Sequence, residues 1–331
     1  MPILQPSVPE LPASLSFAGK TAIVTGANSG LGWASIIHLA QRHISTLILA
    51  VRTRKTGEAT KAALLADPAV RDLPTQPIIL IYELDLSRPS SVASFASKIL
   101  ADIPTLNILL LNAGIGNLAW VTTPETQTEQ MFQINFLSNA LLAVRLLPLL
   151  RASAQKSSTT SYLCIVGSRM IPLHSYTKNP IPETSSVFAF VNDPAHFKRF
   201  SRYPDTKVLV TMIIRELAKR TDAAEVTVNS VCPGMVKTNI DTKQPLWVKV
   251  PASLIQAIRG RTAEVGARSL VNAVSAGPET HGQMLGDFEV WGNTFLDTDQ
   301  GKKMEEKVWK ETLAAADTFA PGSVEEANLR D

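Results

Sequence analysis

Tyr203 and Lys207 are the residues whose types and spacing point most directly to chemistry. Their four-residue separation places both side chains on one face of a helix. A free tyrosine has a pKa of about 10, which is too high for an efficient general base near neutral pH. An ammonium group beside the phenol favours the phenolate and so lowers the tyrosine pKa. The pair therefore predicts a site that exchanges a proton with a substrate oxygen.

Pro204 and Asp205 indicate where the helix that carries this pair begins. Proline needs no amide donor in a first helical turn, and an aspartate complements the positive end of the helix dipole. The helix is therefore expected to start near Tyr203, at the carboxyl edge of a sheet, where ligands of open α/β folds bind.

Ser168 is the expected hydroxyl partner of Tyr203, because it follows the apolar run Tyr162 to Val166, which is typical of a strand. From the end of that strand it would hydrogen-bond the same substrate oxygen. The interval from Ser168 to Tyr203 is long. It leaves three alternatives that do not follow a strand so directly: Ser175, Ser185 and Ser186.

A glycine-rich turn lies between the first apolar run and a helical segment, and it spans Thr25 to Gly32. Glycines in such a turn let the backbone bend sharply, approach a pyrophosphate and pack the helix close to the sheet. The amides at the helix start then receive the phosphate charge. The alternative is an ordinary strand-to-helix connection. The residues expected at the dinucleotide are Gly26, Asn28, Ser29, Gly30, Leu31 and Gly32.

Arg52 ends the next apolar run, about twenty residues after the last of these glycines, where an NAD-selective fold usually places an acidic residue. A guanidinium there suits a 2′-phosphate through charge-assisted hydrogen bonds. The sequence therefore favours NADPH over NADH. Arg54 and Lys55 lie close by, and a solvated basic loop is the competing interpretation.

The chain resembles the short-chain dehydrogenase/reductase family from about Gly19 to about Gly286. The motifs that carry the resemblance follow the family's order: the glycine turn, Asn112-Ala113-Gly114, Ser168, Tyr203 with Lys207, and Pro233-Gly234 with Thr238. Three shorter stretches are similar to retinol dehydrogenases, WW-domain oxidoreductases and fungal biosynthetic reductases: Ala50-Val51-Arg52, Gly57-Glu58-Ala59 and Asp85-Leu86-Ser87.

The resemblance implies a role for each matching residue. Tyr203 would transfer the proton, Ser168 would orient the substrate oxygen, and Lys207 would bind the nicotinamide ribose. Asn135 would support the lysine through a water. The remaining residues implied to bind NADP(H) are Asp85 and Leu86 at the adenine, Asn112, Ala113 and Gly114 along the cofactor, and Pro233, Gly234, Val236 and Thr238 near the carboxamide.

Asp205 and Thr206 depart from the family pattern, which commonly has small residues between the tyrosine and the lysine. We expect both to be tolerated if they face solvent.

Short aliphatic runs alternate with helical segments, which predicts a doubly wound parallel sheet in three α/β/α layers, a Rossmann fold in one domain. The expected strands are Thr21 to Thr25, Thr46 to Ala50, Ile78 to Glu83, Ile108 to Leu111, Tyr162 to Val166 and Val226 to Val231. The expected helices are Leu31 to Gln41, Thr56 to Ala66, Ser91 to Ala101, Thr128 to Leu150 and Val208 to Arg220.

The proposed boundaries are an N-terminal extension at 1–16, the domain at 17–296 and a C-terminal tail at 297–331. Within the domain, residues 169–202 are a candidate lid. The aromatic and aliphatic residues of this segment, among them Phe188, Phe190, Phe197 and Phe200, are expected to form the pocket wall together with Val236 to Val250.

Composition limits the other classes of function. The net charge is only +3 and the basic residues are scattered, so nucleic acid is not an expected partner. Cys164 and Cys232 are expected to be small buried apolar residues, and the histidines show no metal-ligand spacing. The richest apolar segment, Leu137 to Leu150, contains Arg145 and Pro148 and is too short to span a bilayer. No signal peptide is expected, and a cytoplasmic location follows.

The sequence thus predicts a reductase that acts on a medium-sized, apolar carbonyl or alcohol, similar to fungal secondary-metabolite ketoreductases. Two rivals remain: a non-redox cyclase or dehydratase on the same fold, and a nucleotide-sensing interaction protein. The sequence leaves the oligomeric state open. In many relatives, helices like Thr128 to Leu150 and Val208 to Arg220 form the contact of a homodimer or homotetramer; the alternative is that the charged C-terminal tail covers this surface.

Overall fold

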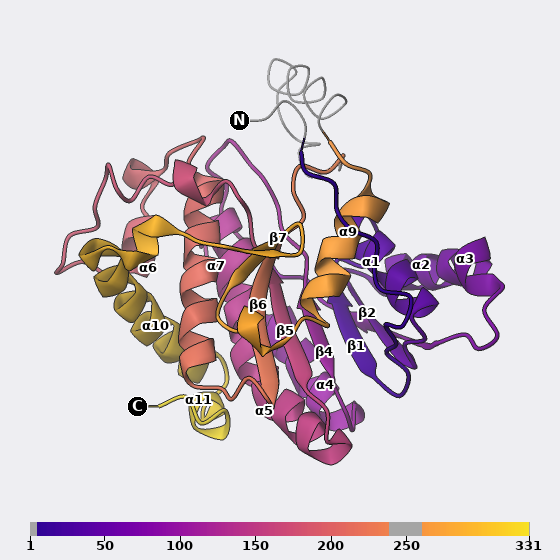
Figure 1. Ribbon diagram of the computed structural model, residues 1–331. Coiled ribbons are helices and arrows are strands. Elements are labelled where there is room, and N and C mark those ends of the chain that lie inside the picture. The colour runs from indigo at the N-terminus through magenta and orange to yellow at the C-terminus, as the bar shows by residue number, and fades with distance from the viewer. Residues whose placement is uncertain (1–4, 238–259, 331) are drawn as a thin grey trace.

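An eight-stranded sheet runs through the centre of the computed structural model, which describes residues 5–237 and 260–330 (Figure 1). The strand order is β3-β2-β1-β4-β5-β6-β7-β8, and only β8 runs antiparallel to its neighbour. The strands are β1 Thr21–Thr25, β2 Thr46–Val51, β3 Ile78–Glu83, β4 Ile108–Leu111, β5 Ser161–Val166, β6 Val226–Cys232, β7 Met284–Gly286 and β8 Glu289–Trp291. The order reverses between β1 and β4, so a ligand crevice is expected at their carboxyl ends.

Helices cover both faces of this sheet and give the three expected layers (Figure 1). One face carries α1 Gly30–Gln41, α2 Arg54–Ala66, α3 Pro68–Arg71 and α9 Ala263–Ala273. The other carries α4 Pro89–Asp102, α5 Ser138–Ser157 and α7 Arg202–Lys219. The central strands β1, β4 and β6 are buried on both sides, which explains why they are rich in aliphatic and β-branched residues.

All six expected strands are confirmed, with ends that differ by at most one residue. The helix expected at Thr128 to Leu150 instead begins with a π-helical turn, η1 Phe132–Leu137, and continues as α5 to Ser157. The combined segment Phe132–Ser157 is therefore longer than expected and is apolar enough by composition to cross a membrane. Because 72% of its apolar window is buried inside the protein, we interpret it as a core helix.

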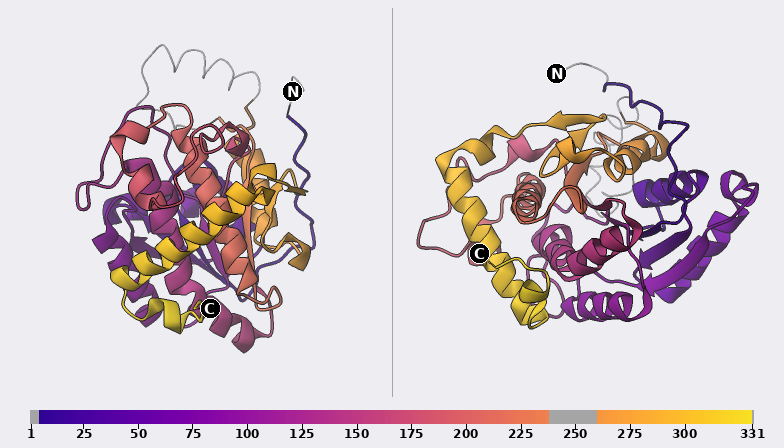
Figure 2. Two further views of the ribbon diagram at one scale, coloured as in Figure 1. Left: turned by 90° about the vertical axis from the view of Figure 1, so that its left-hand side faces the viewer. Right: turned by 60° about the horizontal axis from the view of Figure 1, so that its bottom comes forward.

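The C-terminal residues add a long helix, α10 Asp299–Phe319, and a short one, α11 Ser323–Glu326. Figures 1 and 2 show α10, in yellow, along the outside of α7 and α5. Its buried residues Met304, Val308 and Trp309 join the same core as those two helices. Of the two alternatives for this face of α5 and α7, the structure shows the one in which the C-terminal tail covers it.

The candidate lid, residues 169–202, contains the short elements η2 Ile171–Leu173, α6 Val187–Val191 and η3 Pro194–His196. Helix α10 holds this segment at several points. The Glu311 carboxylate accepts hydrogen bonds from the amides of Val187 and Phe188, each at 2.8 Å. Gln300 Nε2 donates to the Tyr176 carbonyl, also at 2.8 Å. The segment is thus fastened to the body of the protein rather than hinged at its two ends alone.

The N-terminal extension crosses the end of β6. Gln5 Nε2 donates to the Met235 carbonyl at 2.8 Å, and Gln5 Oε1 accepts from the Met235 amide at 2.7 Å. Val8 and Leu11 are buried farther along. The remaining elements, η4 Pro278–Thr280 and η5 Thr294–Asp297, connect α9, the edge strands and α10.

Candidate active site

Tyr203 and Lys207 both lie on the first turns of α7, as the four-residue spacing predicts. The Lys207 ammonium nitrogen is 5.5 Å from the centroid of the Tyr203 ring. It donates a hydrogen bond to the Val166 carbonyl, at the end of β5, at 2.7 Å. This arrangement holds a positive charge beside the phenol at the carboxyl edge of the sheet.

Burial makes Lys207 an unusual lysine. Its side chain is almost wholly enclosed, and desolvation lowers the pKa of its ammonium from 10.5 to about 8. The group therefore remains mainly protonated at neutral pH but loses its charge within a range that an assay can reach.

Ser168 lies two positions after the end of β5 and is buried. Its Oγ accepts a hydrogen bond from the Met170 amide at 3.1 Å, which still leaves its proton to donate. Since Lys207 binds the carbonyl of Val166, the same stretch of chain carries both the lysine's acceptor and Ser168. The Ser175 alternative has another partner, because it hydrogen-bonds Asp205.

Asn135 lies within the π-helical turn η1, a type of helix irregularity that is frequent at functional sites. Its Nδ2 donates to the Ile115 carbonyl at 2.9 Å, and its Oδ1 accepts from the Ile115 amide at 2.8 Å. A Cβ on Gly114 would lie 3.2 Å from Asn135 Oδ1 and 3.8 Å from Lys207 Nζ. Asn135, Gly114 and Lys207 therefore share one small space, and Asn135 fixes the backbone there.

The glycine turn has the shape that phosphate binding requires. Gly26 and Gly30 have φ values of 68° and 54°, which favour glycine, and Ser29 at the start of α1 makes no side-chain capping bond. Asn112 Nδ2 donates to the Thr25 carbonyl at 2.9 Å, which fixes the turn to the end of β4. The uncapped, positive end of α1 fits the phosphates of a dinucleotide.

Gly32 gives a direct test of this turn. A Cβ there would clash with the Gly26 carbonyl oxygen and lie 2.8 Å from Asn112 Nδ2. We expect Gly32→Ala to lower the free energy of unfolding by about 1 to 3 kcal/mol and to weaken dinucleotide binding by about tenfold or more. Fluorescence titration and thermal unfolding measure the two effects. Gly292→Ala is the matched control, because a Cβ on Gly292 meets no atom within 4 Å; equal effects of both variants would contradict this role.

Arg52, Asp85 and Leu86 follow the next two strands toward the edge of the sheet. Arg52 is exposed, and its side chain has no hydrogen-bond or ion-pair partner within the described residues. The neighbouring Arg54 guanidinium instead pairs with Glu58 at 3.1 Å. Asp85 Oδ1 accepts from the Ser87 amide and hydroxyl, while Leu86 is buried. Arg54 is thus engaged within its own helix, whereas Arg52, at the end of β2, is available for a phosphate.

The turn after β6 brings Pro233, Gly234 and Val236 to the same edge. Gly234 has a φ of 76°, and Val236 is buried. A Cβ on Gly266 of α9 would lie 2.8 Å from Val236 and 3.0 Å from Leu31, so the turn adjoins the start of α1. Thr238, and the expected pocket residues after it up to Val250, lie outside the described residues.

The side chains of Asp205 and Thr206 do not face solvent, because both are buried in the first turns of α7. The ring of Phe188 packs against Phe132 and Phe136, with ring centroids 5.0 and 5.7 Å apart. Helix α6 turns this side chain inward, toward the core.

Thr25 and Asp205 are two residues whose contacts beside the site the sequence motifs did not predict. Thr25 Oγ1 accepts from the Ala113 amide at 2.9 Å and so shapes the cofactor side of the site. Its position directly before Gly26 was the available signal. The signal for Asp205 was its departure from the small residues of the family pattern.

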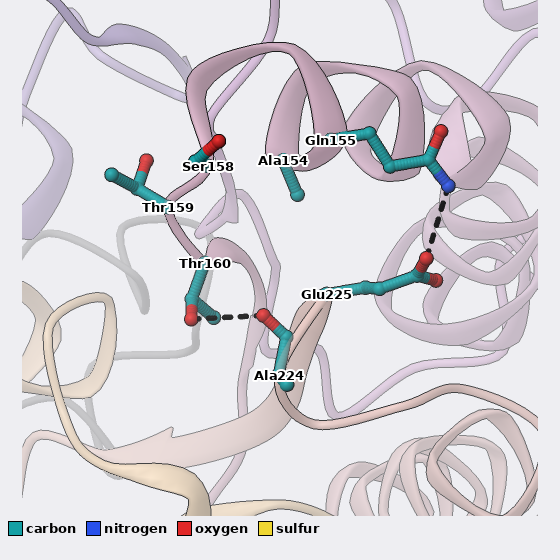
Figure 3. Close-up of a pocket in the computed structure, with 7 residues that line it drawn as sticks. All are labelled: Ala154, Gln155, Ser158, Thr159, Thr160, Ala224 and Glu225. Atoms are coloured by element: carbon teal, nitrogen blue, oxygen red, sulfur yellow. Dashed lines mark hydrogen bonds between the residues drawn. The ribbon is translucent and has the colours of Figure 1, made fainter.

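A pocket of about 270 Å³ lies away from this site (Figure 3). Ser158 to Thr160 and Ala224 to Glu225 line it, and they precede β5 and β6. It therefore belongs to the amino edge of the sheet, opposite Ser168 and Gly234. The Glu225 carboxylate accepts from Gln155, and the Thr160 hydroxyl donates to the Ala224 carbonyl. We therefore do not interpret this pocket as the catalytic site.

Cys164 and Cys232 are free and buried, as expected. Burial raises the pKa of both thiols, so neither is an activated nucleophile. In residues 5–237 and 260–330, no group of three histidine, cysteine or acidic side chains is arranged to hold a metal ion.

The chain matches the family model described as short chain dehydrogenase, at residues 20–179 and 158–249. It is 36% identical to a short chain dehydrogenase of Arthrobotrys oligospora, over 97% of this chain and 99% of that protein. It is also 36% identical to the short-chain dehydrogenase/reductase tropG of Talaromyces stipitatus, over 93% and 94% of the two chains.

Among solved structures, the fold is similar to that of an NADPH-bound carbonyl reductase from chicken fatty liver, with a TM-score of 0.59. The sequences are 18% identical, and the match covers 85% of this chain and 97% of that one. At this identity the likeness concerns the fold.

Proposed function

This chain belongs to the short-chain dehydrogenase/reductase family, and from that membership we propose that it is an NADPH-dependent oxidoreductase acting on a medium-sized apolar compound. It would interconvert a carbonyl group and a secondary alcohol, with reduction as the cellular direction. The observation that carries the proposal is the Lys207 ammonium held 5.5 Å from the Tyr203 ring at the edge where the glycine turn opens.

The side chains divide the reaction between them. Bound NADPH supplies a hydride to the substrate carbon. Tyr203 donates its proton to the carbonyl oxygen, and the Ser168 hydroxyl holds that oxygen by a hydrogen bond. The Lys207 ammonium stabilises the phenolate that the proton leaves behind. Asn135 keeps the Ile115 backbone in place beside the lysine.

NADPH is proposed over NADH because Arg52 is exposed and unpartnered in the described structure at the end of β2. Solved structures of similar fold hold NADPH in one case and NADH in another, so the fold alone does not choose. The charge of the residue at this position decides between a 2′-phosphate and a 2′-hydroxyl.

Arg52→Asp is expected to reverse the preference. The carboxylate repels a 2′-phosphate and accepts from ribose hydroxyls, so kcat/KM with NADPH should fall by about 10²-fold relative to that with NADH. Parallel initial rates with the two cofactors measure the ratio. Arg54→Asp is the control, since Arg54 pairs with Glu58. An unchanged ratio in Arg52→Asp would remove Arg52 from cofactor selection.

An apolar substrate is supported by large side chains that are exposed around the same edge. Leu173 and Phe200, near opposite ends of the candidate lid at 169–202, are 60% and 65% exposed, and Met235 after β6 is 41% exposed. Burial of such side chains against a substrate is favourable. NADPH consumption against a panel of apolar ketones and aldehydes, with polar sugars as the contrast, tests this preference.

We also propose a role in fungal secondary metabolism and a cytoplasmic location. Two fungal relatives of almost full length support the first, and two buried free thiols, which reducing compartments preserve, support the second. A homodimer or homotetramer would use a surface other than α5 and α7, because α10 covers them.

A further inference from the structure

Asp205 is a buried acid two positions after Tyr203, and only 2% of its surface is exposed. Its carboxylate accepts two hydrogen bonds from Ser175, one from the amide at 2.6 Å and one from the hydroxyl at 2.9 Å. A carboxylate is costly to bury unless its oxygens are satisfied. Ser175 supplies that compensation from a different part of the chain.

This contact lies on the opposite side of Ser168 from the Lys207 contact. Lys207 donates to the carbonyl of Val166, just before Ser168, and Asp205 accepts from Ser175, just after η2. The first two turns of α7 therefore hold the chain on both sides of Ser168. Tyr203 lies on the same turns, so the two links fix the serine segment relative to the tyrosine.

The surroundings of Asp205 are charged and closed. Arg202 is wholly buried in the same turn, and its Nε lies 4.0 Å from an oxygen of Glu129, which precedes η1. The buried hydroxyl of Tyr176, in the candidate lid, also interacts electrostatically with Asp205. Burial raises the pKa of Asp205 to about 6, while the Ser175 bonds and the Arg202 charge oppose that rise. Burial likewise raises the pKa of Glu129.

We propose, resting on the function proposed above, that Asp205 is a positioning residue that holds the Ser168 segment in register with Tyr203 through Ser175. The ionised carboxylate accepts both bonds. Protonation of the carboxylate removes part of its capacity to accept hydrogen bonds and removes its attraction to Arg202. The Ser168 segment is therefore held less firmly relative to Tyr203 as the pH falls through about 6. The serine and tyrosine then meet the substrate oxygen less often in productive geometry.

Asp205→Asn and Asp205→Ala test the proposal by steady-state kinetics with the best substrate of the panel. We expect kcat to fall by about 10- to 100-fold in Asp205→Ala, with KM for NADPH within about twofold, and less in Asp205→Asn. In the wild-type protein kcat should fall as the pH drops below about 6, and this acid limb of the pH profile should be absent in both variants. Asp222→Asn is the matched control, because Asp222 hydrogen-bonds a backbone amide beyond the other end of α7.

Folding does not confound this test. Since burial disfavours the ionised form of Asp205, its charge costs folded-state stability above about pH 6, and Asp205→Asn removes that cost. Thermal unfolding at pH 8 should therefore show no loss of stability in Asp205→Asn.

Hydrogen exchange supplies a readout that needs no substrate. Protection of residues 169–176 should fall by about tenfold in Asp205→Ala and stay unchanged in Asp222→Asn. Wild-type kcat and an intact acid limb in Asp205→Asn, or unchanged protection in Asp205→Ala, would overturn the proposal. If the wild-type protein reduces no panel compound, the proposed function fails separately, and the exchange result still decides whether Asp205 holds the segment.

Discussion

Replacing Tyr203 by phenylalanine is expected to lower kcat by about 10³-fold while NADPH still binds. Phenylalanine keeps the ring beside Lys207 but removes the hydroxyl that we propose transfers its proton to the substrate oxygen. Loss of a positioned general acid typically costs 10²- to 10⁴-fold. Initial rates of NADPH consumption and a fluorescence titration of NADPH measure the two quantities on the same preparation.

Tyr82→Phe is the control for this change, because the Tyr82 hydroxyl hydrogen-bonds Asp102 at 3.1 Å at the far edge of the sheet. It should retain wild-type activity. A Tyr203→Phe protein with more than about a tenth of wild-type kcat would show that the phenol does not carry the proton. The assay also separates the rivals: a cyclase or dehydratase forms product without consuming NADPH, and a sensor binds NADPH without turnover.

Replacing Lys207 by methionine is expected to lower kcat/KM by about 10²- to 10³-fold. The change keeps the apolar stem but removes the ammonium that favours the phenolate. For the wild-type protein, the lowered pKa of about 8 predicts that activity declines as the pH rises through that value, since the charge is then lost. The rate profile from pH 6 to 10 measures this limb, which should be absent in Lys207→Met.

Measurements of the free energy of unfolding distinguish a loss of activity in Lys207→Met from a loss of the fold. The folded-state pKa of Lys207 is lowered, so the folded protein binds fewer protons than the unfolded chain between about pH 8 and 10.5. Its charge therefore costs roughly 3 kcal/mol below that window, and Lys207→Met relieves the cost while leaving the Val166 carbonyl unpaired, a loss of about 1 to 3 kcal/mol.

The net change in unfolding free energy is expected to be small. Lys61→Met is the matched control, since Lys61 also donates to a backbone carbonyl, that of Ile79. It should leave activity intact. A Lys207→Met protein that is folded and fully active would contradict the electrostatic role of the lysine.

The central strands and the glycine turn could be predicted from the sequence, because the residue patterns that indicate them lie within short stretches of the chain. Strands β1, β2, β4, β5 and β6 are largely buried and rich in aliphatic and β-branched residues, while the edge strand β3 is only partly buried. The glycines at Gly26 and Gly30 have the positive φ that their spacing implies. Strands β7 and β8 were not predicted, because three residues are too few to show a period. Helix α9 was also missed.

The candidate site was predictable in its residue types but not in their surroundings. The spacing of Tyr203 and Lys207 indicated a shared face, and the structure gives the 5.5 Å separation. The burial of Asp205 depends on Ser175, a partner distant in sequence, and no local pattern encodes such a contact. The π-helical turn at Asn135 was invisible for the same reason, since an apolar helix reads alike with or without it.

The position of α10 has a consequence for how the protein is made. Ribosomes make a chain from its N-terminal end, so α10 emerges after α5 and α7. Until then, the apolar surface of α5 and α7 that Met304, Val308 and Trp309 cover in the finished protein faces water. From the time that α5 and α7 have emerged until α10 follows, the nascent chain therefore carries this part of its core uncovered, and that apolar surface is open to chaperones.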